Sequence, residues 1–339
     1  MRHLPLVLAA ICALCAPLVC TAQWTPPAEG RGFLDRPPVY VNNEPYFPLT
    51  GLGVIMPEPG VTVPDIDLSG VSADHWIQNG QNVQPGLDLE IDWIRVGALR
   101  GFRGGWAAGI SVPYYRNLVV GTIGGFPAAS IAQGFGNVAL GGKRVVWQDK
   151  CQTQRVIVAG AVELPTGKDD AIFGPNNAAT NGYYGTASRQ RIPLGWQPST
   201  GTWNGLVALS YGHYYKRLSW EYLLAGKING TGDQDVHVGS VLITALTGTY
   251  GISKSLAGTL GLTLRAQADD DYPRSPIPVN QFPLTATTTH STLLYLDVGI
   301  RYVVMEKAVV GIAIRTPINQ PAEGMEPTTQ ISYIFYPNM

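Results

Sequence analysis

Hydrophobic and polar residues alternate along most of the chain after residue 50. In residues 218–227, for example, Leu218, Trp220 and Tyr222 fall on one face, and polar residues occupy much of the other. Residues 292–302 follow the same rule. Because successive side chains of a strand point to opposite faces of a sheet, a period of two predicts strands with one apolar and one polar side.

The alternation predicts about twelve strands. They lie near residues 52–68, 87–99, 105–116, 135–147, 155–165, 204–215, 218–229, 238–250, 256–268, 289–304, 308–316 and 329–336. Many have about 10 to 13 residues, which suits a tilted strand that crosses a bilayer, whereas strands of soluble proteins usually have five or six. After residue 22 no apolar run approaches the roughly 20 residues of a transmembrane helix.

The connections between these segments alternate in length. Short turns are predicted near residues 100–104, 148–154, 215–217, 252–255 and 306–307, and longer polar or Gly/Pro-rich loops at 69–85, 117–133, 166–202, 230–236, 269–288 and 317–328. Short turns on one side and long loops on the other are typical of outer-membrane barrels, whose sheet must close because lipid cannot satisfy an open edge. The predicted fold class is therefore all-β, a transmembrane antiparallel up-and-down β-barrel of about 12 strands over residues 51–339.

The N-terminus carries the pattern of an export signal. Arg2 precedes an apolar stretch at residues 4–19, and Cys20-Thr21-Ala22 offers a cleavage site, so residues 1–22 are predicted to be a signal peptide. Six prolines in residues 23–50 disfavour helix and central strand, which predicts a Pro-rich periplasmic N-terminal segment.

Composition narrows the class of protein further. Only 14% of residues are charged, 45% are hydrophobic, and the formal net charge is -1. Without a basic stripe to collect phosphates, nucleic acid is not an expected partner. Export and barrel pattern together predict the bacterial outer membrane of a Gram-negative cell, with outer-membrane lipids, lipopolysaccharide and the barrel assembly machinery as partners.

Charged residues on the polar faces are the candidates for lining the lumen, because a charge that faces lipid costs a few kcal/mol near the bilayer midplane. Two interpretations stay open: the charges form salt bridges that plug a narrow barrel, or they line a water-filled path and tune its selectivity. The predicted lumen-lining residues are Asp88, Glu90, Asp92, Lys143, Glu163, Glu221, Lys227, Arg265, Asp297, Arg301 and Arg315.

The longest predicted outer loop, residues 166–202, is the candidate for a gate or a substrate vestibule. It contains the aromatic residues Phe173, Tyr183, Tyr184 and Trp196. Aromatic side chains on a loop can stack on aromatic ligands, although they could equally pack the loop onto the barrel rim.

No catalytic or metal site is predicted. His290 and Ser291 are adjacent, and neighbouring residues of a strand point to opposite faces, so this histidine is badly placed to activate this serine. The acidic run at residues 269–271 lacks the glycine spacing of a calcium loop. We therefore expect no enzymatic activity, no metal and no cofactor.

Several local patterns resemble one family of outer-membrane proteins. They are "DHWIQNGQNV" followed by "LDLEIDW", "GGWAAGISVPYY", "GFGNVALGGKRV", "VAGAVELPTGKDD", "ALSYGHYYKRLSWEYLLAGKING" and "YGISKSLAGTLGLTLRAQADDD". From about residue 50 onward the chain is similar to the MetA-pathway of phenol degradation family. The resemblance implies a monomeric barrel, similar in architecture to fatty-acid and aromatic-hydrocarbon uptake barrels, that is associated with passage of small, often aromatic or apolar molecules.

The predicted function is that of a passive outer-membrane channel for small molecules, with aromatic or hydrophobic compounds as candidate substrates. A structural or adhesive barrel with a plugged lumen is the alternative. A barrel hydrolase is a third and weaker hypothesis.

Overall fold

We describe the fold from a computed structural model of the 339-residue chain. The residues that the structure describes are 56–57, 59–78, 81–83, 87–123, 126–150, 153–167, 169, 197–215, 217–232, 237–253, 255–269, 291–304, 308–319, 324–327 and 329–337. The predicted signal peptide and Pro-rich segment lie outside this part of the chain, so both stay predictions.

The described residues form β-strands joined by turns and irregular segments. The strands are β1 (Thr62–Gln78), β2 (Gln81–Val83), β3 (Leu87–Phe102), β4 (Trp106–Ile123), β5 (Phe126–Phe135), β6 (Val138–Gln148), β7 (Gln154–Leu164), β8 (Asn204–Tyr215), β9 (Leu218–Asn229), β10 (Val241–Gly251), β11 (Leu256–Gln267), β12 (Ser291–Val304), β13 (Ala308–Pro317), β14 (Gly324–Pro327) and β15 (Gln330–Pro337). Among the described residues, no helix has the length and apolar character needed to cross a membrane.

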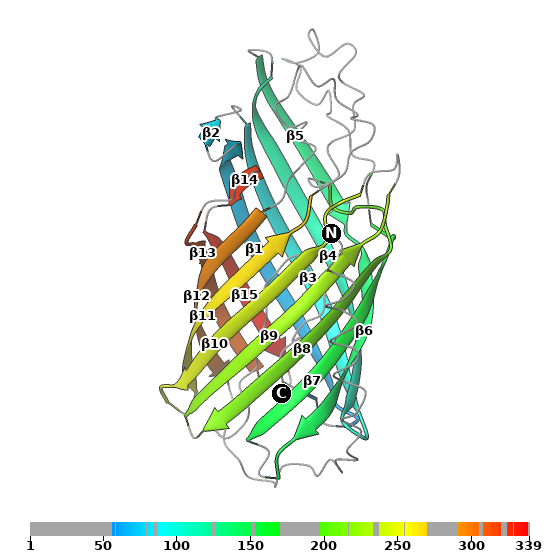
Figure 1. Ribbon diagram of the computed structural model, residues 1–339, viewed down its shortest axis with the longest axis vertical. Coiled ribbons are helices and arrows are strands. Elements are labelled where there is room, and N and C mark those ends of the chain that lie inside the picture. The colour runs from blue at the N-terminus through cyan, green and yellow to red at the C-terminus, as the bar shows by residue number, and fades with distance from the viewer. Residues whose placement is uncertain are drawn as a thin grey trace.

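The strands close into a single antiparallel barrel (Figure 1). Consecutive strands pair from β6 to β13, β13 pairs with β15, and β1 closes the ring by pairing with β15 on one side and β3 on the other. Three barrel strands are each divided into two segments. β2 and β3 both pair with β1, β5 and β6 both pair with β4, and β14 and β15 both pair with β1. When the two segments of each divided strand are counted as one, the barrel has 12 strands, as predicted.

Two predicted boundaries near the start of the barrel are wrong. The first strand occupies Thr62–Gln78 rather than residues 52–68, and it fills most of the region predicted as a loop at 69–85. Pro64 is tolerated because this part of β1 pairs with β3, whereas the pairing with β15 begins only at Ile66. A proline is tolerated where a strand is paired on one side only and its nitrogen faces away from the neighbouring strand.

The predicted loop at residues 117–133 is also wrong. It forms the upper part of β4 and most of β5, which pair from Tyr114–Phe135 to Ile123–Phe126. This hairpin rises beyond most of the other strands (Figure 1). Its small and mixed side chains lack the apolar alternation of a lipid-facing strand, which explains why the sequence pattern indicates a loop there.

The barrel is apolar outside and polar inside. Outward side chains such as Leu246 and Leu262 expose 51% and 47% of their surface, whereas the inward Thr263 and Lys143 expose 0% and 4%. A soluble barrel would show the opposite arrangement, because water would surround its outer face. An apolar outer band is what a bilayer requires of a spanning sheet.

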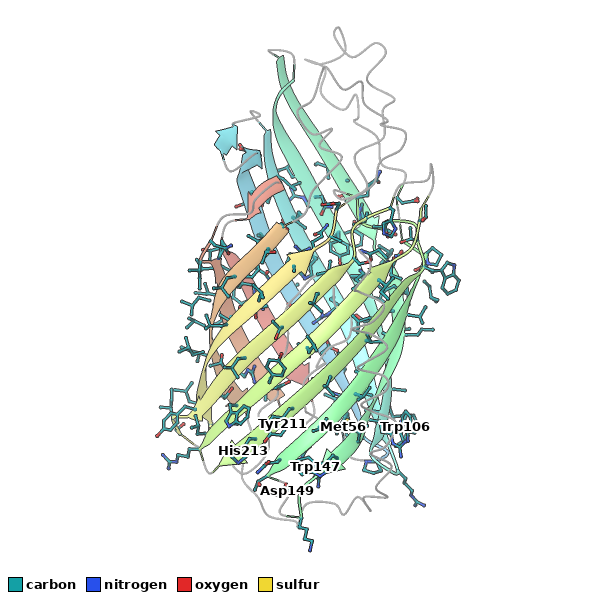
Figure 2. The ribbon with its side chains drawn as sticks, in the orientation of Figure 1. Met56, Trp106, Trp147, Asp149, Tyr211 and His213 are labelled. Carbon is teal, nitrogen blue, oxygen red and sulfur yellow. The ribbon has the colours of Figure 1, made fainter. Side chains whose placement is uncertain are left out.

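Aromatic side chains gather near the end of the barrel that carries the short turns. Trp106, Trp147, Tyr211 and His213 lie toward this end (Figure 2). The indole of Trp220 donates a 3.1 Å hydrogen bond to Nδ1 of His213, and the Tyr211 and Trp220 rings meet edge to face at 5.1 Å. Rings with one wet edge suit the membrane–water interface.

Candidate functional site: the barrel lumen

The pairing register places eight of the eleven predicted lumen residues on the inward face. Directly paired residues share a face, and the buried row Lys143–Ala159–Ala208–Ala225–Ile243–Arg265 runs across six strands. The same reasoning places Glu163, Glu221, Lys227, Asp297, Arg301 and Arg315 inward. Whether these side chains select solutes stays a prediction.

The prediction that Asp88, Glu90 and Asp92 line the lumen is wrong, because these side chains face outward. They alternate with the buried Leu89 and Trp93 along β3. Asp92 forms a 3.3 Å ion pair with Arg116, and both side chains remain almost half exposed. These charges stand above Ile94 and Val96, the exposed apolar residues of the same strand face. They therefore lie beyond the apolar band, where an outward charge carries no lipid penalty.

Four inward charges were missed by the sequence prediction. On β1 and β3 the Arg95 guanidinium lies 3.1 Å from the Asp67 carboxylate and 4.0 Å from that of Asp65. Arg155 of β7 shares a row with Gly212 and therefore points inward. For Arg95 a signal was available, because it lies between Ile94 and Val96, which face lipid.

Three arginines of β11, β12 and β13 dominate one wall of the lumen. Arg265 lies toward the loop end, Arg301 lies near the turn end, and Arg315 lies between them, so we call these three residues the arginine ladder. Each is at least nine-tenths buried. Asp297 is the one acidic residue of these three strands, and it forms an ion pair with Arg315.

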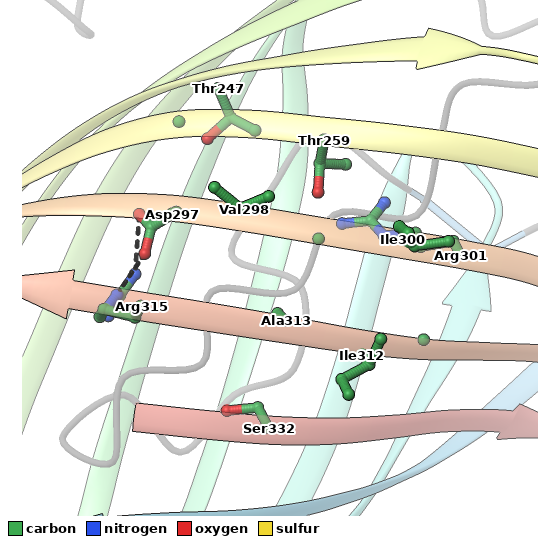
Figure 3. Close-up of a pocket in the computed structure, with 13 residues that line it drawn as sticks. Thr247, Thr259, Asp297, Val298, Ile300, Arg301, Ile312, Ala313, Arg315 and Ser332 are labelled. Atoms are coloured by element: carbon green, nitrogen blue, oxygen red, sulfur yellow. Dashed lines mark hydrogen bonds and ion pairs between the residues drawn. The ribbon is translucent and has the colours of Figure 1, made fainter. Parts of the chain in front are cut away.

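A small cavity separates Arg301 from the Arg315–Asp297 pair (Figure 3). Its volume is about 40 Å³, which is enough for about three water molecules. Gly299 and Ala313 form part of its lining, together with the hydroxyl-bearing Thr259. The cavity thus combines small side chains with guanidinium and hydroxyl groups at its ends.

The neighbouring wall of the lumen is apolar. It consists of buried residues of β7 to β10, which we call the apolar wall: Ala159, Ala161, Leu206, Ala208, Leu223, Ala225, Val241, Ile243 and Ala245. Arg265 is paired directly with Ile243, so the arginine ladder begins where the apolar wall ends. The lumen therefore offers a charged and an apolar surface side by side.

A buried polar network crosses the loop end of the lumen. The Lys227 ammonium lies 2.9 and 2.8 Å from the two carboxylate oxygens of Glu163, and the Asn204 amide donates a 2.7 Å bond to the same carboxylate. Asn204 in turn accepts from the Thr202 hydroxyl at 2.7 Å. Two sequence-predicted lumen residues thus form one ion pair that is tied to the outer loop.

The described ends of the outer loop meet at Asn137, between β5 and β6. Its side-chain oxygen accepts from the Ser199 hydroxyl at 2.5 Å and from the Gly167 backbone N–H at 3.4 Å, and its amide donates to the Thr202 carbonyl at 3.1 Å. The Thr166 hydroxyl accepts from the backbone N–H of Val138 at 2.9 Å. The Gly-Asn and Pro-Thr-Gly patterns of the sequence therefore come together here, and both loop ends are fixed to the barrel.

We expect Asn137→Ala to release these loop ends. Losing three hydrogen bonds around a buried side chain should cost roughly 1–3 kcal/mol, and limited proteolysis of the folded protein should cut the outer loop faster. Thr316→Ala is the control, because its 3.2 Å contact with Thr329 is exposed on the rim. Equal cleavage of the two variants would show that Asn137 does not hold the loop.

The predicted gate residues Phe173, Tyr183, Tyr184 and Trp196 lie outside the described residues, so their role stays a prediction. His290 also lies outside them. Within the described part of the chain, no group of three or more His, Cys, Asp or Glu residues is placed to hold a metal ion. The expectations of no enzyme, no metal and no cofactor stay predictions as well.

The geometry defines a class: a closed, inside-polar and outside-apolar β-barrel of the outer-membrane type. No protein-family model matches the chain, and no curated protein matches it. Among solved structures it is similar to the "COG4313 outer membrane channel from Pseudomonas putida F1", with a TM-score of 0.62 and 11% identity over 88% of this chain and 100% of that one.

Two further solved barrels show weaker likeness. The NanC porin matches with a TM-score of 0.44 and 8% identity over 81% of this chain and 100% of that one. The TodX monoaromatic hydrocarbon channel, a deletion mutant, matches with a TM-score of 0.42 and 10% identity over 83% of this chain and 91% of that one. At these identities the likeness concerns the fold, and it does not confirm the MetA-pathway family name.

Proposed function

We propose that this protein is an outer-membrane channel through which small molecules diffuse passively. The observation that carries the proposal is the inverted barrel: an apolar outer band surrounds a lumen that bears charged side chains on many of its strands. Barrels of the outer membrane use such polar interiors as aqueous paths and tune selectivity with lumen charges. The likeness to the COG4313 channel supports the same function.

The path is narrow rather than porin-like. Inward residues on different sides of the sheet order, such as Ile157 of β7, Ile243 of β10 and Thr263 of β11, have no exposed surface at all. Twelve strands also lie between the small filled barrels and the wide porins of 16 strands or more. The same burial favours the alternative of a structural barrel with a sealed lumen, so permeation must be measured directly.

We further propose that aromatic or apolar compounds are the substrates. The support for this is the apolar wall, a cluster of inward apolar side chains that a purely polar pore lacks. Outer-membrane lipids, lipopolysaccharide and the barrel assembly machinery remain the expected partners.

Liposome swelling tests the proposal. Folded protein should admit phenol-sized aromatics, and small sugars more slowly. Ala245→Trp places a bulky ring in the apolar wall and should slow entry several-fold, whereas Leu246→Trp, one residue away on the outer face, should leave entry unchanged. Absence of entry through protein shown to be folded by heat-modifiable gel mobility would contradict the channel.

A further inference from the structure

We infer that the lumen recognises small amphipathic anions, in particular carboxylates attached to an apolar body. This inference deepens the proposed function, on which it rests for the transport of such solutes. Its basis is the placement of the arginine ladder next to the apolar wall.

The charges of the described strands favour an anion. Inward basic residues outnumber inward acidic ones: they are Arg95, Lys143, Arg155, Lys227, Arg265, Arg301 and Arg315, against Asp65, Asp67, Glu163, Glu221 and Asp297. The excess is concentrated on β11 to β13, which carry three inward arginines and one inward aspartate. Because low-dielectric walls focus the field of such a patch, it raises the local concentration of anions.

The arginines suit a carboxylate in particular. A guanidinium is planar, permanently charged and able to bind a carboxylate through two parallel hydrogen bonds. The structure already shows this chemistry once, because Nε and Nη2 of Arg315 both donate to the Asp297 carboxylate. Arg265 and Arg301 carry the same chemical group, and Nη2 of Arg265 donates a 2.6 Å hydrogen bond to the side-chain oxygen of Gln267.

The cavity between Arg301 and the Arg315–Asp297 pair is the place for the charged group. Its volume of about 40 Å³ matches a carboxylate or a halide rather than a whole aromatic molecule. Gly299 keeps it open, since a Cβ added there would lie 2.6 Å from the Thr259 hydroxyl oxygen. Glycine at this position therefore preserves space beside the arginines.

The apolar wall fits the rest of the solute. Ile243 and Ala245 are paired directly with Arg265 and Thr263, so buried apolar side chains of β10 lie next to the ladder, and the apolar part of a bound solute would pack on this side. Neutral aromatics gain only the contact with the apolar wall, and cations are repelled by the arginine ladder. The lumen thus discriminates by charge among solutes of equal size.

Two measurements on the full-length protein test this inference. In planar bilayers under a KCl gradient, the reversal potential should show roughly threefold or greater preference for chloride, strongest at low salt. Arg301→Gln should remove much of that preference. Arg144→Gln removes the same charge from the outer face, where the guanidinium lies 4.9 Å above the Trp106 ring, and should change nothing.

Equilibrium dialysis supplies a readout that does not depend on transport. Folded wild-type protein in detergent should retain more benzoate than benzyl alcohol or benzylamine, and Arg301→Gln should lose the difference. Benzoate retention without conductance would sink the channel and keep the inference. Conductance without chloride preference and without benzoate retention would overturn the inference and keep the channel, and the absence of both signals would overturn both.

Discussion

Lys227→Met should destabilise the barrel by roughly 3–5 kcal/mol, because it leaves a buried carboxylate without its cation. Glu163 and Lys227 expose no more than a tenth of their side chains and lie 2.8 Å apart. Urea unfolding of the protein in lipid vesicles, followed by tryptophan fluorescence, measures the change.

Two further variants separate this ion pair from a general effect of losing a lysine. Glu163→Gln combined with Lys227→Met should recover most of the loss, since glutamine is neutral and still accepts the hydrogen bond from Asn204. Lys150→Met, at an exposed turn position, should be within about 0.5 kcal/mol of wild type. A small effect of Lys227→Met alone would mean that the Glu163 carboxylate is solvated.

Leu262→Arg should cost roughly 2–4 kcal/mol, the penalty for an arginine near the bilayer midplane. Leu262 lies in the middle of β11, faces outward and is paired with Leu246 and Leu296, which are exposed as well. The same unfolding measurement applies. A negligible cost would contradict the assignment of this face to lipid.

Ser72→Arg provides the matched control on the outer face. Ser72 is exposed and paired with Glu90, in the region above the apolar band. The new arginine should cost less than about 1 kcal/mol, because it meets water and a carboxylate rather than hydrocarbon. A cost equal to that of Leu262→Arg would mean that Asp88, Glu90 and Asp92 lie within the hydrocarbon layer, which contradicts their assignment above the apolar band.

The barrel class and most strands could be predicted from the sequence, because the strands from β8 to β13 alternate between residues that face lipid and residues that face the lumen. The same physics explains the errors. The rule that charges point inward holds only inside the hydrocarbon layer, and β3 continues above it, so Asp88, Glu90 and Asp92 were assigned to the wrong face. On such a strand the apolar residues nearest the membrane, Ile94 and Val96, define the orientation.

Other features depend on contacts that no local pattern contains. Asn137 is 62 residues from Ser199 and 65 from Thr202 in the chain, and only the register of β6 to β8 brings it to them. The arginine ladder was visible as three polar positions, but its position beside the apolar wall follows from the strand order of β7 to β13.

The most direct test of the central claim is single-channel recording of the folded protein in planar bilayers. A narrow aqueous path through the barrel predicts discrete current steps that disappear with heat-denatured protein and shrink in Ala245→Trp but not in Leu246→Trp. Silent bilayers containing demonstrably inserted, folded protein would contradict the channel and favour a barrel with a sealed lumen.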